Sequence, residues 1–164
     1  MDIIRILLGT STLLCALVAG LVLTFAIIVM PGLKSLNNHD YLQSFKVMDG
    51  IIQNNQPVFI LVWLGSVLTL IAAAVLGVWQ LQGVERTLLI TACVLYVGGV
   101  QIPTVIFNIP LNNELQATDL SVSNETELQP LRDRFESTWI QWNSIRTVMA
   151  VLIVVILIFV LLKL

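Results

Sequence analysis

The chain has 164 residues, of which 57% are hydrophobic and 11% are charged, and its mean hydropathy is +0.94. A soluble domain of this length carries far more charged surface, so the composition predicts a membrane protein. The net charge is −2 and basic residues never cluster, which argues against nucleic acid as a partner and against polybasic attachment to anionic lipid. Cys15 and Cys93 lie alone in separate apolar segments, which argues against a disulfide oxidoreductase and favours a packing role.

Four apolar segments are long enough to cross a bilayer as helices, which takes about 20 residues. They cover residues 3–30, 58–81, 87–107 and 143–164, and they predict an all-α integral membrane four-helix bundle. We expect residues 1–164 to form a single four-span domain with both termini on one side, and residues 31–56 and 108–142 to cap it. The first segment is too long for the core of a signal peptide and ends in Met-Pro-Gly, so we expect it to be retained.

Residues 31–56 contain the pattern of an amphipathic helix that lies over the bundle. Asp40 and Gln43 have the spacing of a capping box, which predicts that this helix is capped at Asp40. Apolar side chains then recur at helical spacing at Tyr41, Phe45, Met48 and Ile52. Asp49 falls on the border of the apolar face, where a pair with Lys46 one turn earlier and a role in a site are both open.

The second and third spans are joined by a short turn, so we expect them to be antiparallel neighbours. The third span contains Gly98, Gly99 and Pro103, which predict a bend toward its far end. Three polar side chains share one face of this span: Gln101, Thr104 and Asn108. Polar groups within a span need partners inside the bundle, so this face either bonds a neighbouring helix or lines a pocket.

The last span belongs to a longer helical pattern. Apolar and aromatic positions repeat at intervals of three and four from Pro130, so we expect one extended helix that projects beyond the membrane. Four side chains share one face near the membrane edge: Trp139, Trp142, Asn143 and Arg146. A tryptophan or an arginine alone is typical of an interfacial anchor. The neighbouring amide favours a pocket, because a permanently charged guanidinium at this depth needs polar partners.

Three stretches of the sequence form a set. They read Met-Asp-Gly-Ile-Ile-Gln-Asn-Asn-Gln-Pro at 48–57, Phe-Asn-Ile-Pro-Leu-Asn at 107–112 and Trp-x-x-Trp-Asn-x-x-Arg-Thr at 139–147. Together they resemble the anthrone oxygenase-like family of small four-span membrane proteins, and the likeness covers almost the whole chain. Some fungal relatives are assigned to polyketide pathways in which dioxygen oxidises an anthrone to an anthraquinone. The resemblance implies an oxidoreductase that acts on a flat, hydrophobic phenolic, anthrone or quinol-like molecule at the loop-side mouth of the bundle.

Such a reaction needs a dry apolar slot, a base and donors for an oxyanion. For this chemistry, the candidate oxyanion donors are Arg146, Asn143, Asn108 and Asn112, and the candidate base is Asp49 or His39. The resemblance implies substrate contacts at Trp139, Trp142, Asn108, Asn112, Gln101 and Asn54. His39 is the only histidine, and a lone histidine beside a helix cap is more often solvated than a ligand. No metal cluster, nucleotide loop or flavin motif is visible in the sequence, so the cofactor is unknown.

The alternative function is a non-catalytic four-span scaffold that binds lipid or another membrane protein, with the same polar residues only locking helices together. The expected partners are the membrane and a hydrophobic small molecule or lipid, and homo-oligomerisation stays open. A count of positive charges mildly favours cytoplasmic loops, but we attribute the loop-side charges to structure or to the pocket. We therefore expect an integral, multi-pass protein of the plasma (inner) membrane with both termini in the cytoplasm.

Overall fold

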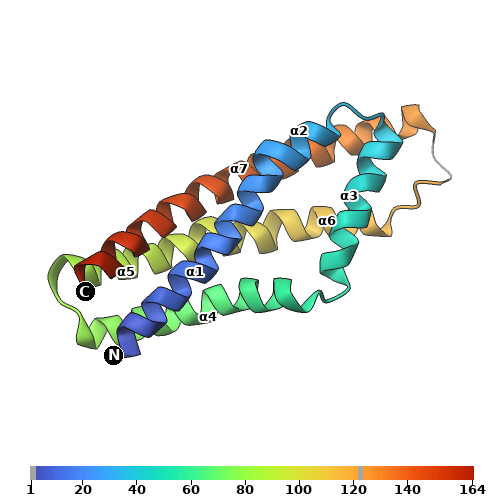
Figure 1. Cartoon of the computed structure of the whole chain (residues 1–164). Helices are drawn as coiled ribbons and strands as arrows, with labels where there is room; N and C mark the ends of the chain where they lie inside the picture. Colours follow the sequence, from blue (N-terminus) through green and yellow to red (C-terminus); the bar gives the residue numbers. More distant parts are fainter. Residues whose placement is uncertain (1–2, 122–123) are drawn as a thin grey trace.

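The computed structural model describes residues 3–121 and 124–164, and these residues are almost entirely helical, with no strand among them. Four long helices are apolar enough to cross a membrane, and they cover Ile3–Leu33, Pro57–Gln80, Gly83–Ala117 and Glu125–Lys163. Figure 1 shows them side by side, with both ends of the chain at one end of the bundle. The predicted four-helix bundle is confirmed, and the protein is a multi-pass membrane protein.

Short π-helical turns divide the first and third long helices into shorter elements, and the second and fourth are continuous. The first is made of α1 (Ile3–Thr24), a π-helical turn η1 (Phe25–Val29) and α2 (Met30–Leu33). The second is α4 (Pro57–Gln80), and the fourth is α7 (Glu125–Lys163). The third joins α5 (Gly83–Tyr96), two π-helical turns, η2 (Val97–Gln101) and η3 (Thr104–Asn108), and α6 (Ile109–Ala117). The remaining helix, α3 (Asn38–Gln53), crosses the loop-side end (Figure 1).

Two clusters of buried apolar side chains hold these helices together. One fills the membrane-spanning bundle and includes Leu8, Val18, Leu70, Leu89, Tyr96 and Ile153. The other lies beneath α3 and includes Tyr41, Phe45, Leu115, Phe135 and Trp139. Many large apolar side chains on the outer faces of the spans, such as Leu61, Leu68 and Val148, are exposed. Helices that are apolar on all sides are typical of membrane spans, because the inner face packs in the core of the bundle and the outer face contacts lipid.

The cap helix α3 packs on the fourth helix, as its apolar face predicts. The ring of Phe45 lies 4.7 Å from that of Phe135 and 5.2 Å from that of Trp139, both on α7. The predicted cap residue is wrong. The helix begins at Asn38, and the side chain of Asn37 accepts the backbone N–H of Asp40, so Asn37 is the N-cap and Asp40 lies in the first turn. Asparagine is as good an N-cap as aspartate, and here it comes three residues earlier in the chain.

A polar network anchors the start of α3 to the first turns of α7. The side-chain amide of Asn38 donates to the backbone carbonyl of Glu125 at 3.0 Å and to the side chain of Gln129 at 2.9 Å. Arg132 donates to the side-chain oxygen of Asn38 at 3.3 Å, and its guanidinium lies 4.3 Å from the centre of the Tyr41 ring. Burial also raises the pKa of Tyr41, so the phenol stays neutral under this cation.

Replacing Asn38 with alanine is expected to destabilise the cap by about 1–3 kcal/mol, because the buried side chain of Asn38 makes three hydrogen bonds to α7 that alanine cannot make. The melting temperature of the purified protein in detergent measures this loss. Asn54→Ala is the matched control, since Asn54 is exposed at the opposite end of the same helix. Equal melting temperatures for the two variants would show that the polar network does not hold the cap.

The third long helix loses regular α geometry where the glycine pair and Pro103 predict it. Two π-helical turns, η2 and η3, flank Ile102 and Pro103. Proline removes one backbone donor and crowds the preceding turn, and a wider turn relieves that crowding. The helix then continues through α6 to Ala117, beyond the predicted end of the span at residue 107. The angle of the expected bend stays a prediction. Gln101 faces inward, as expected, and accepts the indole N–H of Trp63 at 2.9 Å.

The fourth helix is one continuous rod, as predicted, but it starts earlier than Pro130. A capping box at Asn124 begins it: the Asn124 side chain accepts the backbone N–H of Glu127, and the Glu127 side chain accepts the backbone N–H of Asn124. These reciprocal bonds satisfy two of the free N–H groups that every helix start exposes. The helix therefore includes Pro130 and carries the predicted polar face, unbroken, from the cap into the membrane.

Candidate functional site

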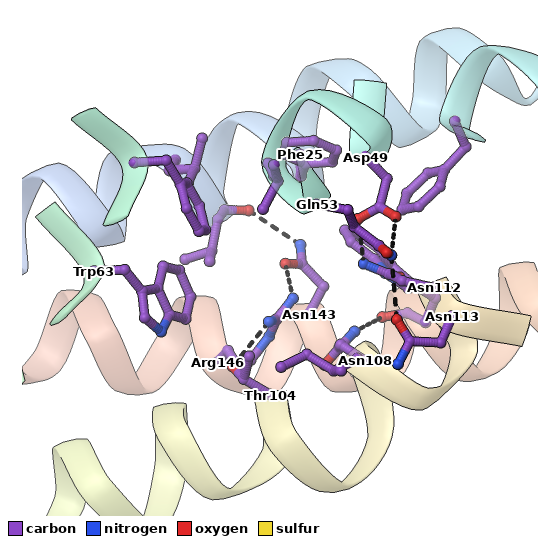
Figure 2. A pocket seen from close by; sticks show the side chains of 17 residues that line it. Phe25, Asp49, Gln53, Trp63, Thr104, Asn108, Asn112, Asn113, Asn143 and Arg146 are labelled. Carbon is purple, nitrogen blue, oxygen red and sulfur yellow. Dashed lines mark hydrogen bonds between the residues drawn. The ribbon is translucent and has the colours of Figure 1, made fainter. Parts of the chain in front are cut away.

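A cavity of about 350 Å³ lies where the cap helix meets the bundle. Its apolar wall comes from α1, η1, α3, α4, α6 and α7 and consists of Leu21, Val22, Phe25, Phe45, Ile52, Phe59, Trp63, Ile109 and Trp139. Its polar wall consists of Asp49, Gln53, Thr104, Asn108, Asn112, Asn113, Asn143 and Arg146. Figure 2 shows the polar side chains arranged from Arg146 at one end to Asp49 at the other. The site is thus an apolar chamber with polar groups at separate positions.

Six of the side chains implied by the resemblance line this cavity: Asp49, Asn108, Asn112, Trp139, Asn143 and Arg146. They come from α3, from η3 and α6, and from α7. Residues that lie far apart in the sequence meet there because α3 crosses the loop-side end of the bundle, from the start of α7 past α6 to the start of α4 (Figure 1).

Four other implied residues do not line the cavity: His39, Asn54, Gln101 and Trp142. His39 lies at the start of α3, where its ring contacts Asp40 at 3.3 Å and its backbone N–H bonds Glu125. Asn54 is the exposed C-cap of α3. His39 and Asn54 therefore lie outside the chamber, which α3 lines with Phe45, Asp49, Ile52 and Gln53.

Trp142 and Gln101 take part in contacts beside the cavity. Trp142 stacks on Phe107, with the ring centres 3.7 Å apart and the planes within 7° of parallel. A spacing of three residues leaves Trp142 about 60° around the helix from Trp139, which is enough to turn it out of the chamber. Gln101 accepts a hydrogen bond from Trp63, which does line the cavity, so Gln101 positions a residue of the wall without lining the cavity itself.

Arg146 is buried, with 5% of its surface exposed, so it does not reach water as an interfacial anchor does. Its Nη1 donates to Oγ1 of Thr104 at 3.0 Å, and its Nη2 donates to Oδ1 of Asn143 at 2.9 Å. The amide of Asn143 in turn donates to the carbonyl of Val22 at 3.0 Å. The polar partners that a guanidinium at this depth needs are thus the hydroxyl of Thr104 and the amide of Asn143.

The guanidinium of Arg146 carries a charge that its direct neighbours do not neutralise. Among the described residues, no carboxylate forms an ion pair with it, and its Nε has no hydrogen-bond partner. The group lies 5.7 Å from the centre of the Trp139 ring, which stabilises a cation only modestly. A buried cation of this kind has unused capacity to hold an anionic or partly charged oxygen.

Asp49 is also buried, with 4% exposed, and it does not pair with Lys46. The ammonium of Lys46 instead donates to the carbonyl of Thr118 at 2.6 Å. Amide side chains surround the carboxylate of Asp49 on both of its oxygens, from Gln53, Asn112 and Gln116. The cavity therefore has a carboxylate held by neutral donors and a separate guanidinium held by neutral acceptors.

Sequence reasoning missed much of the apolar wall. Phe25 comes from the π-turn η1, and the η3 residues Thr104 and Asn108 lie across the chamber from it. The sequence placed Phe45 on the apolar face of the cap helix, and it gave no sign that Phe45 and Trp63 line a cavity. Isolated π-turns inside helices are often found at functional sites, because they alter which side chains face inward. The glycine pair and Pro103 indicated an irregularity in the third long helix only.

The chemical groups in the cavity are a cation, a carboxylate, amides and aromatic rings. Within residues 3–121 and 124–164, no three His, Cys, Asp or Glu side chains gather in a way that would hold a metal ion. What the arrangement offers is acid–base chemistry at Asp49 and oxyanion stabilisation at Arg146. Fold and site together define a multi-pass membrane protein with a chamber lined by aromatic and polar side chains at the loop-side mouth of its bundle.

A family model described as anthrone oxygenase matches residues 51–156, which is well over half of the chain. The protein belongs to this family, and the family suggests an oxygenase-like role. The matched segment includes five of the six implied residues of the cavity and begins just after Asp49. No curated protein and no solved structure matches the chain.

Proposed function

We propose that this protein is a membrane oxygenase that oxidises a flat, hydrophobic phenolic, anthrone or quinol-like molecule with dioxygen inside this cavity. The observation that carries the proposal is a buried carboxylate and a buried guanidinium that line one largely apolar chamber without pairing with each other. The family adds the oxygenase-like role. The chamber volume of about 350 Å³ suits a compact fused-ring molecule, because it lies near the lower end of small-molecule sites, about 300–1,000 Å³.

Substrate binding relies on the aromatic wall. Trp139, Phe25 and Phe45 form one connected group, with ring centres 5.2 to 6.3 Å apart, and Phe59 stacks on Trp63 at 5.4 Å. A flat aromatic molecule gains both apolar burial and ring contacts against such a surface. A ketone or phenol oxygen on this molecule is then directed to Arg146, the one guanidinium of the lining.

The reaction begins with removal of a proton from the substrate. In an anthrone, the methylene carbon lies across the central ring from the carbonyl carbon, so its C–H bond and its oxygen need two separate protein groups. The carboxylate of Asp49 takes the proton, the C–H bond breaks, and the electron pair delocalises onto the substrate oxygen. Arg146 and Asn143 stabilise the resulting oxyanion, because both side chains are buried and line a largely apolar chamber.

Dioxygen then reacts at the carbanionic carbon. A new C–O bond forms, and dioxygen is reduced to a peroxide group on that carbon. The carboxyl group of Asp49 returns its proton to the terminal oxygen, which gives a hydroperoxide. Loss of the second proton from that carbon breaks the O–O bond, gives a carbonyl group and releases water. One anthrone and one dioxygen thus give one anthraquinone and one water, so no other reductant is needed. For a purely structural role, the polar residues would saturate one another without leaving a chamber, and the chamber favours the oxygenase.

The test is turnover by the full-length protein in lipid bilayer discs. Anthrone, a dihydroxyanthrone and a naphthohydroquinone are supplied in turn, and oxygen uptake is followed together with quinone formation. We expect at least one of them to be oxidised faster than in empty discs, with one dioxygen consumed for each anthrone. Rates equal to those in empty discs for all three compounds would contradict the proposal.

We also propose that both termini lie in the cytoplasm, at the plasma membrane. The loop-side arginines are engaged within the protein, since Arg132 pairs with Glu136 at 3.0 Å, Arg134 pairs with Glu114, and Arg146 is buried. We therefore attribute these charges to the structure of the cap and the chamber and not to the orientation of the protein. A thiol introduced as Ser121→Cys should react with an impermeant maleimide in intact cells, whereas Lys163→Cys should react only after lysis. The reverse pattern would overturn the orientation.

A further inference from the structure

The two oxygens of Asp49 are not equivalent. Its Oδ2 accepts two amide hydrogen bonds, from Gln53 at 2.8 Å and from Gln116 at 3.0 Å. Its Oδ1 accepts one, from Asn112 at 2.7 Å. An ionised carboxylate has about four acceptor positions, two on each oxygen. Three are filled by these amides, so the remaining lone pair lies on Oδ1, beside Asn112.

The orientation of the Asn112 amide follows from its two neighbours. The indole N–H of Trp139 donates to Oδ1 of Asn112 at 3.0 Å. An indole can only donate a hydrogen bond and an ionised carboxylate can only accept one. Therefore only one orientation of the Asn112 amide satisfies both, with its oxygen toward Trp139 and its nitrogen toward Asp49. Figure 2 shows Asn112 on the same side of the cavity as Asp49.

The other donors are themselves held. The amide nitrogen of Gln116 also donates to the backbone carbonyl of Lys46 at 2.8 Å, which ties α6 to α3 beside the carboxylate. Gln53 follows Asp49 by one turn on α3, and its amide also reaches Asn113 at 3.2 Å. Both acceptor positions of Oδ2 therefore stay filled by these amides. The position of Oδ1 is held by the amide of Asn112 alone.

We propose that Oδ1 of Asp49 is the atom that takes the substrate proton, and that Trp139, acting through Asn112, is the positioning residue that aims it. The proposal rests on the proposed function, because it assumes a carbon acid in the cavity. In the step it describes, the substrate C–H bond breaks, an O–H bond forms at Oδ1, and the electron pair moves to the substrate oxygen beside Arg146. Trp139 contributes its ring to the wall, and its N–H bond to Asn112 fixes the amide that donates to Asp49.

Proton abstraction is measured apart from oxygenation by hydrogen–deuterium exchange of the anthrone methylene group in heavy water without dioxygen. The full-length protein in bilayer discs should accelerate this exchange over empty discs. Trp139→Phe keeps an aromatic ring but lacks the N–H, and it should slow the protein-dependent exchange about five- to tenfold, the loss expected for one hydrogen bond. Trp142→Phe is the matched control, because Trp142 lies one turn away on the same helix and does not line the cavity.

The connection through Asn112 is tested by combining variants. Asn112→Leu should slow exchange at least as much as Trp139→Phe. The double variant should be no slower than Asn112→Leu alone, because both changes break the same series of hydrogen bonds from Trp139 through Asn112 to Asp49, here called the relay. Equilibrium dialysis of anthraquinone checks that each variant still folds and binds a flat ring. A normal exchange rate in Trp139→Phe, or effects that multiply in the double variant, would overturn the proposal.

The two proposals fail in different ways. Exchange that depends on the relay, without oxidation of anthrone in air, would overturn the oxygenase proposal and leave the relay standing. Oxidation in air with normal exchange in Trp139→Phe would overturn the relay and leave the oxygenase standing. Absence of both exchange and oxidation in the native protein would overturn both.

Discussion

Replacing Asp49 with asparagine is expected to lower the rate of anthrone oxidation by about a hundredfold to ten-thousandfold, the range for loss of a general base. Asparagine has the size of aspartate but cannot take a proton from carbon at neutral pH. It also places a donor among the three amides that now donate to Asp49. The rate is measured by quinone formation, and anthraquinone binding by equilibrium dialysis is measured beside it.

The matched control for this variant is Asp133→Asn. Asp133 is an exposed aspartate on α7 whose carboxylate also accepts an amide, from Gln129 at 2.8 Å, but it does not line the cavity. We expect its turnover to match that of the native protein. If Asp49→Asn binds anthraquinone and turns over anthrone normally, the base is a different group and the role assigned to Asp49 is wrong.

Replacing Arg146 with lysine is expected to lower anthrone oxidation by about a hundredfold or more, the usual loss when one oxyanion donor is removed. Lysine keeps the positive charge but lacks the planar fork whose two nitrogens now bond Thr104 and Asn143. The ammonium group is expected to reach only part of that network, and the oxyanion loses a fixed donor. We also expect weaker binding of flat ketones, while the protein still folds and inserts.

Arg134→Lys is the matched control for the arginine, because Arg134 is an exposed residue of the same helix that pairs with Glu114 on the surface. Pairs of this kind contribute little to stability, so its turnover and melting temperature should be close to native. Normal binding and turnover in Arg146→Lys would contradict the role of the guanidinium in the chamber.

The sequence by itself determined the four spans, the cap helix and the extended last helix. The reason is that the length of an apolar run and the spacing of apolar residues are local properties. It also placed Trp139, Asn143 and Arg146 on one face, since positions three, four and seven apart on a helix share a side. The same spacing rule placed Trp142 with them, and there the residual rotation of about 60° turned the ring onto Phe107 instead.

Only the tertiary structure decided which polar groups meet. Asp49 bonds Asn112 and Gln116, which lie more than sixty positions further along the chain, and Arg146 bonds Thr104 in the preceding long helix. Such pairs depend on the rotation and register of one helix against another, which a local pattern does not specify. The π-turns act in the same way, because each shifts the facing of all residues after it. For this reason the sequence indicated only that polar groups gather at the loop-side mouth. The packing of α3 over the bundle decided that the carboxylate of Asp49 and the guanidinium of Arg146 lie apart.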